Sequence, residues 1–151
     1  MGNLVKTLLT QQDLKEIADA IVKAEHLTSG EIRVEIRQRR SRRERSMSIE
    51  ELARRQFHHL GMTQTKERNG VLLFLLLEDR ELHILGDEGI HSKAGPQTWQ
   101  QIADGMISWF SKRKFREGLI EAVNQVGALL AQHFPRRPDD TNELPNEVRI
   151  R

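Results

Sequence analysis

The feature that most limits the fold of this chain is a run of seven consecutive apolar residues, Val71 to Leu77. A strand with one face in water alternates apolar and polar residues, whereas this segment is apolar at every position. It is also far shorter than the roughly 20 apolar residues that a membrane-spanning helix needs. The pattern therefore predicts a central strand that is covered on both faces.

A second strand is predicted over residues 31–37, which alternate strictly between apolar and charged side chains. Its apolar face is formed by Ile32, Val34 and Ile36, and we expect the other face to be exposed to water. Between the two strands, residues 49–60 carry apolar side chains at helical spacing. A strand, a helix and a strand in this order predict a parallel pair.

A third strand is predicted because Glu78-Asp79-Arg80 is short enough for a hairpin turn, after which residues 81–85 would run antiparallel to the central strand. Further helices are predicted at about residues 10–25, 96–110 and 115–134. These elements define an α/β fold, a three-layer sandwich in which helices cover both faces of a small mixed sheet. The sheet contains one parallel βαβ unit and an antiparallel hairpin strand.

The chain is predicted to have an N-terminal arm over residues 1–9, a single domain over residues 10–134 and a disordered tail over residues 135–151. It has no cysteine, which excludes disulfides and thiolate metal sites. Its 24 Lys and Arg nearly balance its 22 Asp and Glu, so the net charge of +2 gives little reason to expect nucleic acid as a partner. We expect a cytoplasmic monomer without a membrane span, and the identity of any protein partner is open.

Polar side chains are predicted to gather at one edge of the sheet. The first two strands run parallel and the third runs back, so the starts of the first two and the end of the third share that edge. The residues there are Ser29, Glu31, Asn69, Asp87 and Glu88. Carboxylate, hydroxyl and amide oxygens are the ligands that Ca²⁺ and Mg²⁺ prefer, which predicts a divalent-cation site. As an alternative, the acidic residues only solvate a loop and cap local amides.

Seven arginines lie within residues 33–45. Such a run supplies phosphate contacts for nucleic acid or another polyanion. It lacks interleaved aromatic residues for base stacking, which favours a solvated loop or a patch that faces an acidic partner. The candidate polyanion-binding residues are Arg37, Arg39, Arg40, Arg42, Arg43 and Arg45.

The chain resembles the TPM domain, a family named after thylakoid lumen, photosystem II repair and acetylcholine-receptor modulator proteins. The resemblance lies in "TSGEIRVEI", "LGMTQTKERNGVLLFLLLEDRELHILGDEGI" and "KRKFREGLIEAVNQVGALLAQHFP". It extends over about residues 10–135 and is most specific at Arg68-Asn69-Gly70, at Asp79-Arg80 and at Gly86-Asp87-Glu88-Gly89.

The resemblance implies an α/β sandwich that binds divalent cations. Carried over by position, the implied metal ligands are Asn69, Asp87 and Glu88. A plant member implies, as an alternative, a weak metal-assisted acid phosphatase, in which a carboxylate such as Glu88 would orient or deprotonate water. We expect the chain not to be an efficient enzyme.

Overall fold

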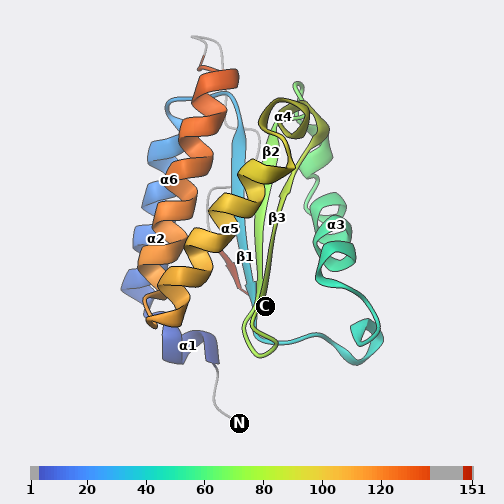
Figure 1. Ribbon diagram of the computed structural model, residues 1–151, viewed down its shortest axis with the longest axis vertical. Helices are drawn as coiled ribbons and strands as arrows, with labels where there is room; N and C mark the ends of the chain where they lie inside the picture. Colours follow the sequence, from blue (N-terminus) through green and yellow to red (C-terminus); the bar gives the residue numbers. More distant parts are fainter. Residues whose placement is uncertain (1–3, 137–147, 151) are drawn as a thin grey trace.

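The computed structural model describes residues 4–136 and 148–150, in which a four-stranded sheet lies between two layers of helices (Figure 1). The helices are α1 (Leu4–Leu8), α2 (Gln11–Glu25), α3 (Ile49–His59), α4 (Glu88–Ala94), α5 (Pro96–Ser111) and α6 (Phe115–His133). The strands are β1 (Glu31–Arg37), β2 (Gly70–Leu76), β3 (Glu81–Gly86) and β4 (Arg149–Ile150). Two short 3₁₀ helices are η1 (Arg42–Glu44) and η2 (Met62–Gln64).

The order of the strands in the sheet is β3-β2-β1-β4. β1 and β2 are parallel, with Glu31 opposite Gly70. β3 runs antiparallel to β2, with Gly86 opposite Val71. The predicted mixed sheet, with one parallel βαβ unit and a hairpin strand, is therefore confirmed.

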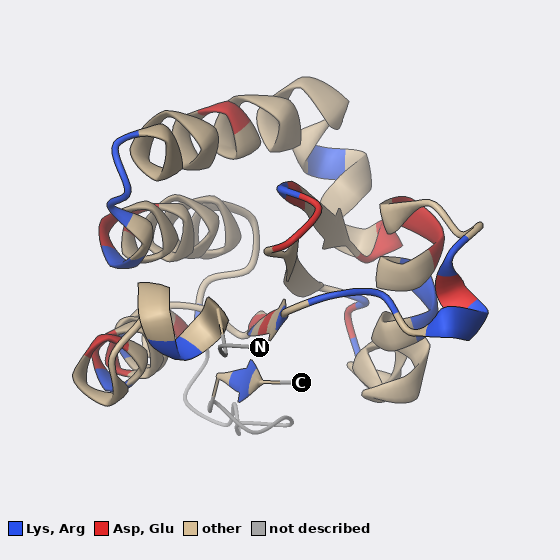
Figure 2. Cartoon of the chain, turned by 90° about the horizontal axis from the view of Figure 1, so that it is seen from below, with Lys and Arg blue, Asp and Glu red and all other residues tan. Residues whose placement is uncertain are grey.

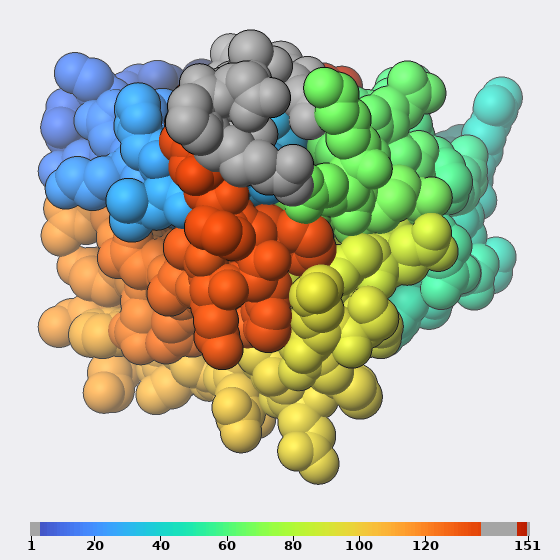
Figure 3. All heavy atoms as spheres, turned by 90° about the horizontal axis from the view of Figure 1, so that it is seen from above, coloured from blue at the N-terminus to red at the C-terminus, as the bar shows by residue number. Residues whose placement is uncertain are grey.

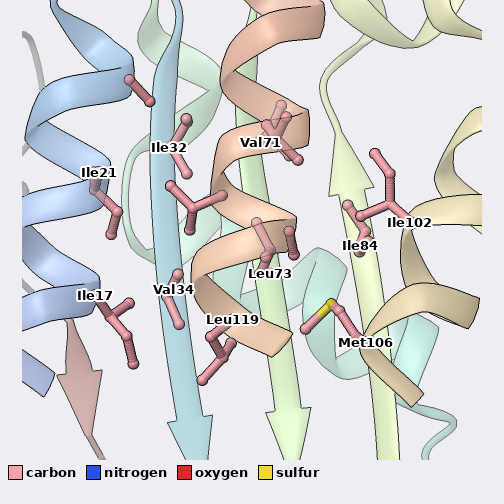
Figure 4. Packing of buried hydrophobic residues seen from close by; sticks show 14 of the residues in the cluster. Ile17, Ile21, Ile32, Val34, Val71, Leu73, Ile84, Ile102, Met106 and Leu119 are labelled. Atoms are coloured by element: carbon pink, nitrogen blue, oxygen red, sulfur yellow. The ribbon is translucent and has the colours of Figure 1, made fainter. Parts of the chain in front are cut away.

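All seven residues of β2 are buried, because helices pack on both of its faces. Val71, Leu73 and Leu75 belong to the larger core, which α2, α5 and α6 cover (Figure 4). The alternate residues, among them Phe74, pack with α3 in a smaller core on the opposite face. The predicted three-layer sandwich is confirmed.

Local signals in the sequence place the helix ends. α2 begins after a capping box, in which the Thr10 hydroxyl accepts from the Asp13 N–H at 3.0 Å and the Asp13 carboxylate accepts from the Thr10 N–H at 2.9 Å. Ser48 caps α3 by accepting from the Glu51 N–H at 3.1 Å. Gly61, just after α3, has a φ of 74°, the left-handed conformation that suits a glycine after a helix.

Besides the two 3₁₀ helices, three segments have regular structure that the sequence did not predict. α1 lies within the expected N-terminal arm, where Val5 is buried in the larger core. α4 begins directly after the acidic turn, and Asp87 is its N-cap. β4 lies within the expected tail and pairs with the outer edge of β1, with Arg149 opposite Glu35. Residues 137–147 and 151 of the tail lie outside the described residues.

The charged face of β1 is buried, so the prediction that it lies in water is wrong. α3 packs against this side of the sheet and contributes Gln56, which donates to Glu35 at 2.9 Å. Glu35, with an exposed fraction of 0%, also pairs with the Arg37 Nε at 3.2 Å and with the Arg149 Nε at 3.3 Å. Arg37 in turn donates to Glu44 at 2.9 Å. The charges are tolerated in the interior because they are paired and hydrogen-bonded.

We expect Glu35→Ala to lower the free energy of unfolding by about 3 kcal/mol, because it removes one partner from a buried ion pair. Urea unfolding followed by circular dichroism measures this loss. The matched control is Glu78→Ala, which removes an exposed ion pair of 3.1 Å with Arg39 and should cost less than about 1 kcal/mol. Equal losses in the two variants would contradict the importance of the buried network.

Candidate functional site

The predicted site residues lie at the same end of the sheet, which Figure 3 shows from above with the segment before β2 beside the start of α4. Glu31 pairs with Gly70, and the Asp87 N–H donates to the Gly70 carbonyl at 2.9 Å. Glu31, Gly70 and Asp87 thus form a row across three strands, in which the outer backbones are about 10 Å apart. Asn69 Nδ2 donates to Ser29 Oγ at 3.3 Å, which joins the loop before β1 to the loop before β2.

Asp87 combines a structural role with an ion pair. As the N-cap of α4 it accepts from the Glu88 N–H through Oδ1 at 2.8 Å. The Arg68 guanidinium donates to both of its oxygens, from Nε to Oδ2 at 2.7 Å and from Nη2 to Oδ1 at 2.9 Å. This two-point geometry is the strong form of an arginine–carboxylate contact. Asp87 is 7% exposed, so Arg68 neutralises a carboxylate that the fold largely removes from water.

Arg68 also approaches the second carboxylate of the acidic turn. Its Nη1 lies 3.3 Å from Glu88 Oε1, while the Glu88 side chain is 74% exposed. One cationic group therefore bridges Asp87 and Glu88, in the position that a bound cation would share with them. The backbone holds this arrangement, because the Gly89 N–H donates to the Arg68 carbonyl at 2.8 Å. A Cβ at Gly89 would lie 2.1 Å from the Glu67 carbonyl oxygen, so only glycine permits the contact.

Glu31 belongs to a different group of side chains. Its carboxyl interacts with that of Glu25, the last residue of α2, and the Ile32 N–H donates to Glu25 Oε2 at 2.7 Å. Burial raises the pKa of Glu25 to about 8, because the hydrogen bond from Ile32 offsets only part of the desolvation and the negative charge of Glu31 adds to it. Sequence reasoning missed Glu25, although its spacing from Ile17 and Ile21 places it on the buried face of α2.

The donor atoms fit a hard divalent cation only in part. Within residues 4–136 and 148–150, no three His, Cys, Asp or Glu side chains are grouped closely enough to hold a metal ion. His91 Nδ1 accepts from Trp99 Nε1 at 3.0 Å, which removes that nitrogen as a ligand. If Arg68 turned away, Asp87 and Glu88 would offer carboxylate oxygens, and water would complete the shell as it does at many Ca²⁺ and Mg²⁺ sites.

The arginine-rich segment lies at the other end of the sheet, beside the β2–β3 turn (Figure 2). Arg37 binds Glu35 and Glu44, Arg39 binds Glu78, and Arg40 binds Asp79 and Glu81. The exposed members of the run are Arg39, Arg42, Arg43 and Arg45. An open hollow of about 590 Å³ is lined by Arg37, Arg39, Arg40, Ser41, Arg42, Glu44 and Arg45. Half of the predicted polyanion-binding arginines are therefore already ion-paired within the chain.

Glu25 makes the stability of the fold depend on pH. Its folded pKa of about 8 lies above the ordinary value of 4.5, so the folded state holds more protons than the unfolded state between these two values. The stabilisation that protonated Glu25 contributes is fully present below the pKa of Glu25 in the unfolded state. It is lost as the pH rises through the pKa of Glu25 in the folded state. The loss is at most about 1.4 kcal/mol per pH unit from one group.

We expect Glu25→Gln to flatten the fall in unfolding free energy between about pH 5 and pH 8, because the amide keeps an acceptor for the Ile32 N–H but does not titrate. Urea titrations across that range measure the slope. Glu117→Gln is the control, since hydrogen bonds to its own backbone N–H and to Arg116 lower the pKa of Glu117 and place its titration below this range. An unchanged slope in Glu25→Gln would refute the assignment.

Known proteins share this architecture. The model of the TPM domain family matches residues 5–129. The NMR structure of the BA42 protein from the psychrophilic bacterium Bizionia argentinensis is similar at 36% sequence identity and a TM-score of 0.85, over 95% of each chain. The solution NMR structure of the N-terminal domain of a protein from P. gingivalis is similar in fold, at 22% identity and a TM-score of 0.69, over 86% of this chain and 83% of that one.

No curated protein matches the chain. Among the described residues, no helix has both the length and the apolar character needed to cross a membrane. The family model covers most of the chain, and the 36% identical structure aligns over 95% of it. The chain belongs to the TPM domain family.

Proposed function

We propose that this TPM domain binds a divalent cation, Ca²⁺ or Mg²⁺, through Asp87 and Glu88, with Asn69 and Ser29 as neighbouring oxygen donors. The observation that carries the proposal is the convergence of both carboxylates on one cationic group, the Arg68 guanidinium. A divalent ion would replace that guanidinium and bind the same two side chains.

The surroundings of Arg68 allow such an exchange. Its side chain is 41% exposed, so the guanidinium can turn into water without being buried elsewhere. Asp87 keeps its place during the exchange because backbone hydrogen bonds to Gly70 and the start of α4 fix it. Glu88 is free to rotate towards an ion, since most of its side chain lies in water.

The exchange also limits affinity. An ion must displace charge-assisted hydrogen bonds worth about 1.5–3 kcal/mol, which weakens binding roughly tenfold to a hundredfold. Glu31, opposite Gly70 on the adjacent strand, would add negative potential in its ionised form. We therefore expect a dissociation constant in the millimolar range. We expect Ca²⁺ to bind more tightly than Mg²⁺, because Ca²⁺ accepts a more flexible shell of oxygen ligands. We further propose, as the sequence predicts, that the protein is a cytoplasmic monomer.

Titration of the ¹⁵N-labelled chain with CaCl₂ or MgCl₂ tests the site. We expect amide shifts confined to the loop before β2 and the start of α4, and their loss in Asp87→Asn, which removes the ligand charge. Arg68→Gln should bind the ion about tenfold more tightly or better, because it removes the competing cation.

Arg39→Gln is the matched control, since it removes an arginine from the exposed pair with Glu78 at the other end of the sheet and should leave ion binding unchanged. Unchanged amide shifts elsewhere in the spectrum report that each variant is folded. Absence of movement near Asp87 at millimolar ion, or weaker binding in Arg68→Gln, would rule out the exchange.

A second candidate function is weak metal-assisted hydrolysis of phosphate monoesters at the same site. The exposed Glu88 carboxylate beside the proposed ion is the observation that favours it, because such a group can orient water towards a phosphate held by the metal. Hydrolysis of p-nitrophenyl phosphate should then depend on added ion and fall at least about tenfold in both Asp87→Asn and Glu88→Gln. Activity that persists in Asp87→Asn would remove this mechanism.

A further inference from the structure

A second hollow, of about 500 Å³, opens at the end of the molecule opposite Asp87. Its walls come from α1, the end of β2, the start of β3, the end of α5 and the start of α6. Sites for small ligands typically measure about 300–1,000 Å³, so the hollow is large enough for one. None of the residues discussed for ion binding contributes to it.

The lining of this hollow is mainly apolar. Leu4 and Leu8 come from α1 and Leu82 from β3, and each is only partly buried. Phe110 and Phe115, at the α5–α6 turn, stack with ring centroids 5.0 Å apart. Ile107 of α5 is 53% exposed although it faces the same hollow. Large apolar side chains left beside a cavity in this way mark a binding surface.

The rim of the hollow carries two arginines, Arg80 from the β2–β3 turn and Arg113 from the α5–α6 turn. Figure 2 shows basic residues in both turns. Each arginine has a positive φ, 54° for Arg80 and 59° for Arg113, in the region that favours glycine or asparagine. Within the part of the chain that the structure describes, no carboxylate forms a salt bridge with either guanidinium.

The acidic residues around Arg80 are occupied by other arginines. Arg39 binds Glu78 at 3.1 Å. Arg40 binds both Asp79 and Glu81, the second at 2.7 Å. Among the described residues that line the hollow, Glu81 is the only one with a carboxylate, and Arg40 compensates its charge. The mouth of an apolar cavity is therefore left with two positive charges.

We propose that this hollow binds a medium-chain fatty carboxylate, such as decanoate. The alkyl chain would lie against the leucines and the two phenylalanines, and the carboxylate would meet Arg80 or Arg113 at the rim. Arginine suits this task because its planar guanidinium matches a carboxylate and keeps its charge at any physiological pH. Neither an apolar molecule without a charge nor a small anion without a chain would use both parts of the surface.

Two properties of the ligand follow from the lining. Burial of each methylene contributes about 0.8 kcal/mol, so affinity should rise about fourfold per methylene from hexanoate to decanoate while the chain still fits. Replacing the carboxylate by a hydroxyl, as in 1-decanol, should weaken binding at least about threefold, because a hydrogen bond to a charged group is stronger than one between neutral groups.

The experiment is a titration of the ¹⁵N-labelled full chain with decanoate, below the concentration at which micelles form. We expect amide shifts in α1, at the start of β3 and at the α5–α6 turn, with none near Asp87. The double variant Arg80→Gln, Arg113→Gln should bind decanoate at least about tenfold more weakly and 1-decanol as before. Arg45→Gln, an exposed arginine away from this hollow's lining, is the control and should change neither affinity.

Several results would overturn the proposal. Equal affinities for decanoate and 1-decanol, or an unchanged affinity in the double variant, would show that the arginines do not recognise the carboxylate. Shifts spread over the whole surface would indicate adsorption of a detergent. If decanoate moved no amide of the hollow while phosphatidylglycerol vesicles or an apolar peptide did, the surface would serve a macromolecule instead.

Discussion

The burial of β2 on both faces is the constraint on which the rest of the structure depends. A strand with no exposed face must lie inside the sheet, so it needs a neighbour at each edge and a helical layer on each side. β1 and β3 fill the edges, one parallel and one antiparallel, and this difference in direction brings the start of β1, the start of β2 and the end of β3 together. The end of β2 and the start of β3 form part of the wall of the apolar hollow at the opposite end.

The face of β1 on the α3 side of the sheet is charged yet buried, and Gln56 of α3 contacts its residues Glu35 and Arg37. Arginines of the same chain neutralise the carboxylates. Arg37 forms ion pairs with Glu35 and Glu44 in the interior. Arg40 forms ion pairs with Asp79 and Glu81 at the hairpin. Arg68 forms ion pairs with Asp87 and Glu88 at the other end of the sheet. These carboxylates near the sheet are thus each paired with an arginine of the same chain.

The sequence predicted what depends on periodicity and on chain direction. The strand β2 and the meeting of three segments at one edge follow from the apolar pattern and from chain direction. The burial of Glu35 could not be predicted in the same way, because its partner Gln56 comes from a helix 21 residues away. The pairing of Arg68 with Asp87 depends on the antiparallel return of β3. The interaction between the carboxyls of Glu25 and Glu31 depends on where α2 ends. Alternation reports that a face is polar, but not whether another layer covers it.

The backbone supplies an independent argument for both ends of the sheet. Among the described residues, the non-glycine residues with positive φ are Arg68, Arg80 and Arg113. For a long side chain this conformation costs on the order of 1 kcal/mol, and glycine or asparagine would avoid most of that cost. Such backbone strain is found where the side chain makes an interaction that glycine or asparagine could not make. Arg68 has a visible task, because its guanidinium neutralises a buried carboxylate. For Arg80 and Arg113 the described residues provide no internal anion, and a ligand carboxylate at the apolar hollow accounts for the choice of arginine at both turns.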